Sequence, residues 1–164
     1  MLVVSNTSPI LNLAIIRRLE LLRQQFEEVL IPPAVHEELS PDSDLPGAGA
    51  VQAALQSGWL RVRAPSNTAL VQTLSLELDR GEAAAIALAV EVKPEFILMD
   101  ESEGRAKAAA LGLHPVGILG VLLRAKLKGQ LASVKEPMTQ LRQEAGFFIA
   151  EELFNTVLQE AGEA

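Results

Sequence analysis

Short apolar runs recur along the first 117 residues, separated by longer stretches with helical periodicity. The first run, residues 2–5, contains the β-branched Val3 and Val4 and predicts a strand. Further strands are predicted at residues 28–31, 59–63, 95–100 and 114–117. Strands joined through helices pair in parallel, because the intervening helix is a crossover connection. The pattern therefore predicts an α/β fold with a central parallel sheet.

The intervening stretches predict helices. Residues 8–25 should form two helical segments that meet near residues 16–18. Further helices are expected at residues 33–39, 50–58, 67–77, 80–92, 101–112 and 118–129. We expect one domain over residues 1–164, with residues 131–164 as a helical C-terminal extension.

The extension holds three of the five phenylalanines in the chain, Phe147, Phe148 and Phe154. Their ordinary role would be to pack against their own domain. The alternative is a partner-binding face, because large apolar patches on proteins mark interfaces.

Composition excludes several classes of protein. Apolar residues make up 49% of the chain, which excludes disorder, and 14 Lys and Arg against 21 Asp and Glu give a net charge of −7. Contacts with nucleic acid must then be local or made through a cation. The chain has no cysteine, no signal peptide and no long apolar span, so we expect a cytoplasmic protein without a membrane partner. Aromatic residues are only 4% of the chain, so base-stacking platforms are not expected.

Two acidic residues lie where an open α/β sheet binds ligands. Asp100 ends the run at residues 95–100 and should emerge at the carboxyl edge of the sheet. It also has capping-box spacing with Glu103, a role compatible with metal binding. Glu82 has the same spacing from Asp79, at the start of a helix that is apolar nearly all round and therefore buried.

Glu38 lies on the short helix predicted at residues 33–39. On a helix it lies within the face defined by Ala34, Val35 and Leu39, whereas Glu37 points away from this face. We therefore expect Glu38 to face the core, where a carboxylate needs a cation or hydrogen-bond donors.

Other polar residues flank these acids. For Glu101 we favour an ion pair with Arg105, four residues on, over direct metal binding, and Arg105 could also guide RNA. Asn6 closes the first strand, where a lone Asn is usually a turn or cap residue, and Thr7 or Ser8 can cap the helix that follows.

Asp100, Glu82 and Glu38 come from separate segments, yet each could reach one edge of the sheet. Three carboxylates in one crevice repel each other unless a cation is present. Oxygen ligands without a His or Cys cluster suit Mg²⁺ or Mn²⁺, which can bind phosphates and activate water.

The chain resembles the PIN domain family in four segments: VVSNTSPILNLA, IPPAVHEEL, LDRGEAAAIALA and ILMDESEGRAKAAALGLHPVGILGVLLRAKLKG. Their order and spacing are closest to a PIN-like branch related to the VapC-type toxins of toxin–antitoxin pairs. The resemblance covers about residues 1–130, and the helical tail also fits. It implies a three-layer α/β/α fold and hydrolysis of RNA that depends on Mg²⁺ or Mn²⁺. It also implies a small antitoxin as partner and a homodimer.

Carried over to this sequence, the resemblance implies a metal-binding set of Asn6, Glu38, Glu82 and Asp100. The three acids would be catalytic, and Thr7 or Ser8 would hold a water beside the metal. The family usually has Asp at the position of Asn6, so this site has three formal negative charges instead of four. Weaker metal affinity is the expected consequence.

Two alternatives remain open. The chain could be a catalytically attenuated or inactive PIN-like module that binds RNA or a partner protein, as Asn6 and the net charge favour. It could also be a different metal-dependent phosphohydrolase that acts on nucleotides or DNA.

Overall fold

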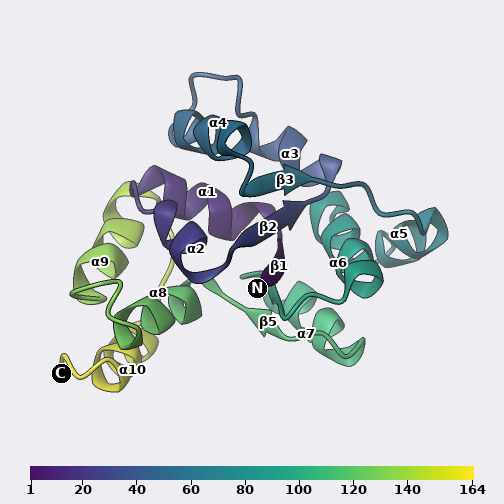
Figure 1. Cartoon of the computed structure of the whole chain (residues 1–164). Helices are drawn as coiled ribbons and strands as arrows, with labels where there is room; N and C mark the ends of the chain where they lie inside the picture. The colour runs from purple at the N-terminus through teal and green to yellow at the C-terminus, as the bar shows by residue number, and fades with distance from the viewer.

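The computed structural model describes residues 1–164 and has a five-stranded, all-parallel sheet at its centre (Figure 1). The strands are β1 (Leu2–Ser5), β2 (Glu28–Ile31), β3 (Leu60–Val62), β4 (Phe96–Leu98) and β5 (Pro115–Val116). Their order across the sheet is β3-β2-β1-β4-β5, so β1 is the central strand. All five strands lie within the predicted runs.

Ten helices surround the sheet. They are α1 (Thr7–Ile15), α2 (Glu20–Gln25), α3 (Pro33–Leu39), α4 (Ala48–Ser57), α5 (Thr68–Leu74), α6 (Arg80–Val92), α7 (Ser102–Ala110), α8 (Ile118–Leu127), α9 (Lys135–Glu144) and α10 (Glu151–Glu160). Helices α3 and α6 have the predicted bounds. The predicted break between α1 and α2 is also present, just after α1, where Arg17 takes a φ of 63° and interrupts the helical path. None of the ten has the length and apolarity needed to cross a membrane.

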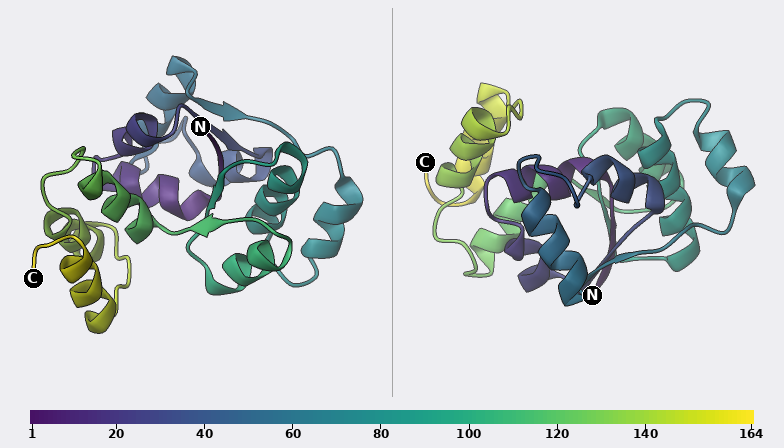
Figure 2. Two further views of the ribbon diagram at one scale, coloured as in Figure 1. Left: turned by 60° about the horizontal axis from the view of Figure 1, so that its bottom comes forward. Right: turned by 90° about the horizontal axis from the view of Figure 1, so that it is seen from above.

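Helices cover both faces of the sheet, which confirms the three-layer α/β/α prediction (Figures 1 and 2). Neighbouring strand residues contribute to opposite cores, as the two-residue period of a strand requires. Val3 and Leu98 belong to one core, whereas Val4 and Ile97 belong to the other.

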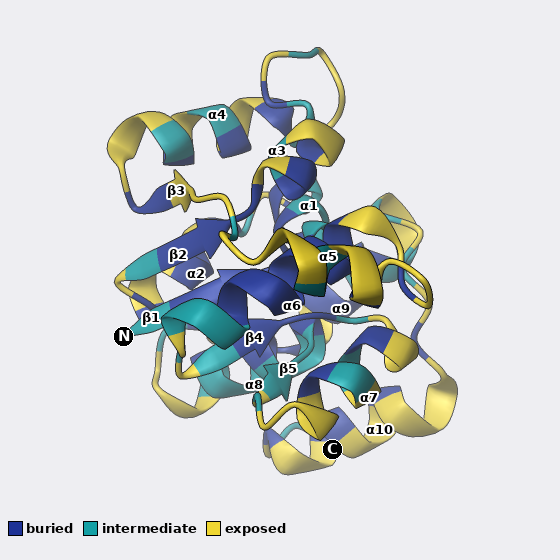
Figure 3. Ribbon diagram, turned by 90° about the vertical axis from the view of Figure 1, so that its right-hand side faces the viewer, coloured by how far each residue is buried: buried dark blue, intermediate teal, exposed yellow.

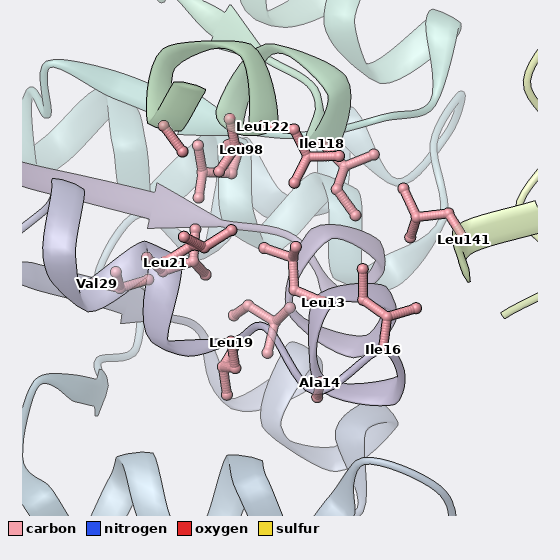
Figure 4. Close-up of a cluster of buried hydrophobic side chains, with 14 of the residues drawn as sticks. Leu13, Ala14, Ile16, Leu19, Leu21, Val29, Leu98, Ile118, Leu122 and Leu141 are labelled. Atoms are coloured by element: carbon pink, nitrogen blue, oxygen red, sulfur yellow. The ribbon is translucent and has the colours of Figure 1, made fainter. Parts of the chain in front are cut away.

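The larger core joins one face of the sheet to α1, α2 and α8 (Figure 4). Helices α4, α9 and α10 extend it, and Leu141 and Phe154 bring the C-terminal extension into the same core. Phe154 thus packs on its own domain, whereas Phe148 is exposed.

The smaller core lies under α6. Residues 81–89 of this helix are all buried, as its apolar sequence predicts, and they appear as the dark blue part of α6 in Figure 3. Leu74 of α5 and Ala108 of α7 complete this layer.

The register of the sheet positions the candidate site. Ser5 at the end of β1 lies opposite Leu98 at the end of β4, and the Asn6 N–H donates to the Leu98 carbonyl at 2.9 Å. The residues that follow these strands, Asn6 and Asp100, therefore emerge at the same carboxyl edge of the sheet, where open α/β folds bind their ligands.

Candidate metal centre

Asn6 occupies the N-cap position of α1 without capping it. Its backbone is extended, with φ −81° and ψ 177°, but its side chain accepts no bond from the helix. The residue is 5% exposed, and its Oδ1 is buried without any hydrogen-bond partner. A buried acceptor without a donor is costly, so this oxygen lies where a ligand could satisfy it.

Thr7 and Ser8 do not cap α1, because the helix already begins at Thr7. Their hydroxyl groups bind two of the candidate acids. Thr7 Oγ1 donates to Glu38 Oε2 at 2.7 Å, and Ser8 Oγ donates to Asp100 Oδ2 at 3.0 Å. Asn12 Nδ2 in turn donates to Ser8 Oγ at 3.0 Å. The first turn of α1 therefore holds carboxylates from two other segments.

The expectation that Glu38 faces the core is wrong, because Val35 and Leu39 fill the buried side of α3 and leave Glu38 exposed. Its carboxylate turns toward the start of α6 instead. A Cβ added to Gly81 would lie 2.5 Å from Glu38 Oε1 and 3.3 Å from Asn6 Oδ1. Glycine at this position thus leaves room for two acceptor oxygens. Nearby, Glu37 forms an exposed ion pair with Arg80 at 2.6 Å, which ties α3 to α6.

The predicted capping box at the start of α6 is confirmed. Asp79 Oδ1 accepts from the Glu82 N–H at 2.8 Å, and the Asp79 N–H donates to Glu82 Oε2 at 3.3 Å. Burial raises the pKa of the Glu82 carboxyl above its ordinary value, and the negative charge of Asp79 adds to this. The other oxygen, Oε1, would lie 3.4 Å from a Cβ on Gly104.

Asp100 caps a helix, but not the predicted one. No side chain caps α7, whose N-cap residue is Glu101, so the predicted capping box with Glu103 is wrong. Asp100 Oδ1 instead accepts from the Ile118 N–H at 2.8 Å, at the start of α8. Gly117 is the N-cap residue there and has no side chain to make this bond. Burial raises the pKa of Asp100, although the bonds from Ile118 and Ser8 oppose the shift.

The predicted ion pair between Glu101 and Arg105 is not formed. Glu101 precedes the first turn of α7 in an extended conformation, so its side chain lacks the helical spacing that the pair requires. Arg105 Nη1 donates instead to the Met99 carbonyl at 3.0 Å. Arg105 Nη1 and Asp100 Oδ1 would each lie 3.0 Å from a Cβ on Gly117, so the guanidinium lies beside the carboxylate.

A family model described as a PIN domain matches residues 2–163. The chain belongs to the PIN domain family. No curated protein matches it. PIN domains are generally nucleases, and they generally use divalent metal ions. The relation to the VapC-type branch stays a prediction.

The candidate ligand side chains of this PIN domain have the chemistry that a divalent cation requires. Every candidate ligand is an oxygen, as Mg²⁺ and Mn²⁺ prefer, and the unsatisfied Asn6 Oδ1 is one of them. No three Asp, Glu or His side chains form a group that could hold an ion. Asn6 and Glu38 approach each other beside Gly81, while Glu82 and Asp100 lie on neighbouring segments. The four-residue set therefore stays a prediction.

Sequence reasoning missed two residues of this region. Nothing in the sequence marks Gly81 as part of a site. Only the packing of α3 against α6 shows that a side chain at this position would collide with Glu38. Asn12, one helical turn after Ser8, could have been found from its spacing as the donor that orients the Ser8 hydroxyl.

Proposed function

We propose that this PIN domain is a metal-dependent endoribonuclease, and that it is the toxin of a toxin–antitoxin pair. The observation that supports it best is the buried Asn6 Oδ1, which has no donor and lies beside the Glu38 carboxylate. An acceptor oxygen without a donor, next to a carboxylate, is suited to a hard cation. Membership of a family of nucleases then favours phosphodiester hydrolysis.

The metal would be Mg²⁺ or Mn²⁺, held by Asn6, Glu38, Glu82 and Asp100. A divalent cation supplies neutralisation of phosphate charge and activation of water. The hydroxyl groups of Thr7 and Ser8 orient the carboxylates of Glu38 and Asp100 by donating a hydrogen bond to each. An RNA substrate needs this cation, because the protein has a net charge of −7.

A small antitoxin and a second copy of the chain belong to the same proposal. A neighbouring gene for a protein of antitoxin size would support the assignment as a toxin rather than a housekeeping nuclease.

The second candidate is a catalytically inactive PIN-like module that binds RNA or a partner protein. Asn6 favours it, because an amide contributes a ligand oxygen but no charge. The two candidates predict different effects of Asn6→Asp on the rate of RNA cleavage. A retained but attenuated site gains a charge and should cleave RNA faster, whereas an inactive crevice should not change.

The test combines calorimetric titration with Mn²⁺ and a cleavage assay on structured RNA. We expect the wild type to bind Mn²⁺, Asp100→Asn to bind it more weakly, and Asn6→Asp to bind it more tightly and cleave faster. Absence of Mn²⁺ binding in the wild type, or equal binding by Asp100→Asn, would contradict the enzyme proposal. DNA or nucleotides cleaved in preference to RNA would favour a different phosphohydrolase.

A further inference from the structure

A groove of about 550 Å³ begins at Asp100 and runs between α8 and the C-terminal extension. Its volume lies within the range of roughly 300–1,000 Å³ that is typical of small-molecule sites. Its lining includes Asp100, Arg105, Phe147, Phe148 and Leu153.

Phe148 is the most exposed wall of this groove. Its side chain is 84% exposed, an unusual state for an aromatic residue, and it lies in the non-helical segment between α9 and α10. The preceding Phe147 is half-buried and packs against the larger core. One phenylalanine thus anchors the segment while the next presents its ring to the groove.

The other end of the groove is charged. Arg105 is half-buried and forms no ion pair with any carboxylate, although its guanidinium lies beside Asp100. Its bond to the Met99 carbonyl fixes its position at the groove wall. A positive charge next to a proposed metal ligand suits an anionic group, which would contact both the guanidinium and a cation held by the carboxylate.

We propose that the groove binds one unpaired base of the RNA strand, with the ring of Phe148 stacked on the base and Arg105 facing an adjacent phosphate. The inference rests on the proposed nuclease function, because that function supplies the substrate at Asp100. A flat base next to a phosphate matches a groove that is apolar at one end and has the Arg105 guanidinium, beside the Asp100 carboxylate, at the other.

A protein partner fits this groove less well. A stable protein interface buries about 800 Å² on each partner, whereas only Phe148 and Leu153 are exposed large apolar residues here. Because aromatic residues are few in this chain, the sequence predicted that it has no platform for stacking bases. Folding nevertheless brings two of its five phenylalanines to the groove that Asp100 lines.

The test measures binding of a short, labelled, single-stranded oligoribonucleotide to the full chain, with Ca²⁺ present and the probe checked for intactness. Phe148→Ala should weaken binding roughly 5- to 150-fold, the range expected for loss of one base–aromatic stack. Phe148→Trp should retain binding, and its indole fluorescence should be quenched by RNA. Duplex RNA keeps its bases stacked, so its binding should be insensitive to Phe148→Ala.

Leu76→Ala is the matched control, because Leu76 is also 84% exposed and does not line the groove. Wild-type binding by Phe148→Ala, or equal weakening by Leu76→Ala, would overturn the inference. So would a change in sedimentation without a change in RNA affinity, which would mark the groove as a contact between copies. Absence of cleavage by the wild type in Mn²⁺ would overturn the nuclease proposal alone, because the binding comparison does not depend on cleavage.

Discussion

Gly81 is the second residue of α6, and its missing side chain leaves space for the Glu38 carboxylate. In Gly81→Ala, the added methyl group would lie 2.5 Å from Glu38 Oε1, which must therefore move. We expect the variant to bind Mn²⁺ more weakly by calorimetry. Its thermal stability should be unchanged or slightly higher, because Glu38 is a flexible side chain and alanine favours helix by up to about 1 kcal/mol.

Gly49→Ala is the matched control for this substitution. Gly49 is also the second residue of a helix, α4, but a Cβ there would meet nothing within 4 Å. Gly49→Ala should therefore leave Mn²⁺ binding unchanged. Full Mn²⁺ affinity in Gly81→Ala would show that Glu38 Oε1 does not contribute to the metal site.

Asn6 occupies a helix-cap position without acting as a cap. Its position after a strand and before a helix is typical of a cap, and it does occupy the N-cap position. Its side chain makes no cap bond and leaves a buried oxygen without a partner. The sequence could not distinguish a capping side chain from one with an unpaired oxygen. Both require an Asn at the N-cap position with the same extended backbone.

At the scale of elements, the start of α6 depends on a reciprocal pair of bonds between Asp79 and Glu82. Asp79→Ala removes the side chain that accepts from the Glu82 N–H and should lower the free energy of unfolding by about 1 kcal/mol. Asp79→Asn keeps an acceptor and should retain most of the stability. Chemical denaturation of the three proteins measures the difference, and equal values for Asp79→Ala and the wild type would show that the box contributes nothing.

The two capping predictions had different outcomes for a physical reason. The box at α6 is local, since both partners lie within one turn, and sequence spacing was enough to find it. Asp100 instead accepts from Ile118, 18 residues further on. That bond exists because β4 and β5 are paired, which brings the end of one strand to the start of α8.

At the scale of the whole molecule, Glu163 joins the C-terminus to the start of α9. Its carboxylate accepts from Ser133 Oγ at 2.9 Å and the Val134 N–H at 2.8 Å, and it lies 3.3 Å from Lys126 Nζ. Burial acts to raise the pKa of Glu163, but these bonds outweigh it and hold the pKa below its ordinary value of 4.5. Ionised Glu163 therefore stabilises the folded chain.

The sign of the pH dependence follows from this lowered pKa. The stabilisation is fully present above the ordinary value of 4.5 and is lost as the pH falls through the lower pKa of the folded state. At neutral pH, Glu163→Gln should cost about 1 kcal/mol in the free energy of unfolding, and this difference should vanish in acid. Chemical denaturation across the acidic range measures it.

Glu160→Gln is the control for Glu163→Gln. Glu160 is the exposed last residue of α10, and its side chain forms no hydrogen bond or ion pair. Its substitution should leave the free energy of unfolding unchanged at every pH. A Glu163→Gln difference that persisted unchanged in acid would show that the carboxylate charge is not the source of the stabilisation.

The sequence by itself determined the alternation of strands and helices, the burial of α6 and its capping box, because periodicity and short-range spacing specify all three. It also predicted that Asp100, Glu82 and Glu38 reach one edge of the sheet, and this set stays a prediction. Only the tertiary structure decided that Glu38 is exposed, that Asp100 caps α8, and that Asn6 Oδ1 is buried without a donor. These outcomes depend on contacts between segments far apart in the chain. The spacing of residues along the sequence specifies only short-range contacts, so it could not predict them.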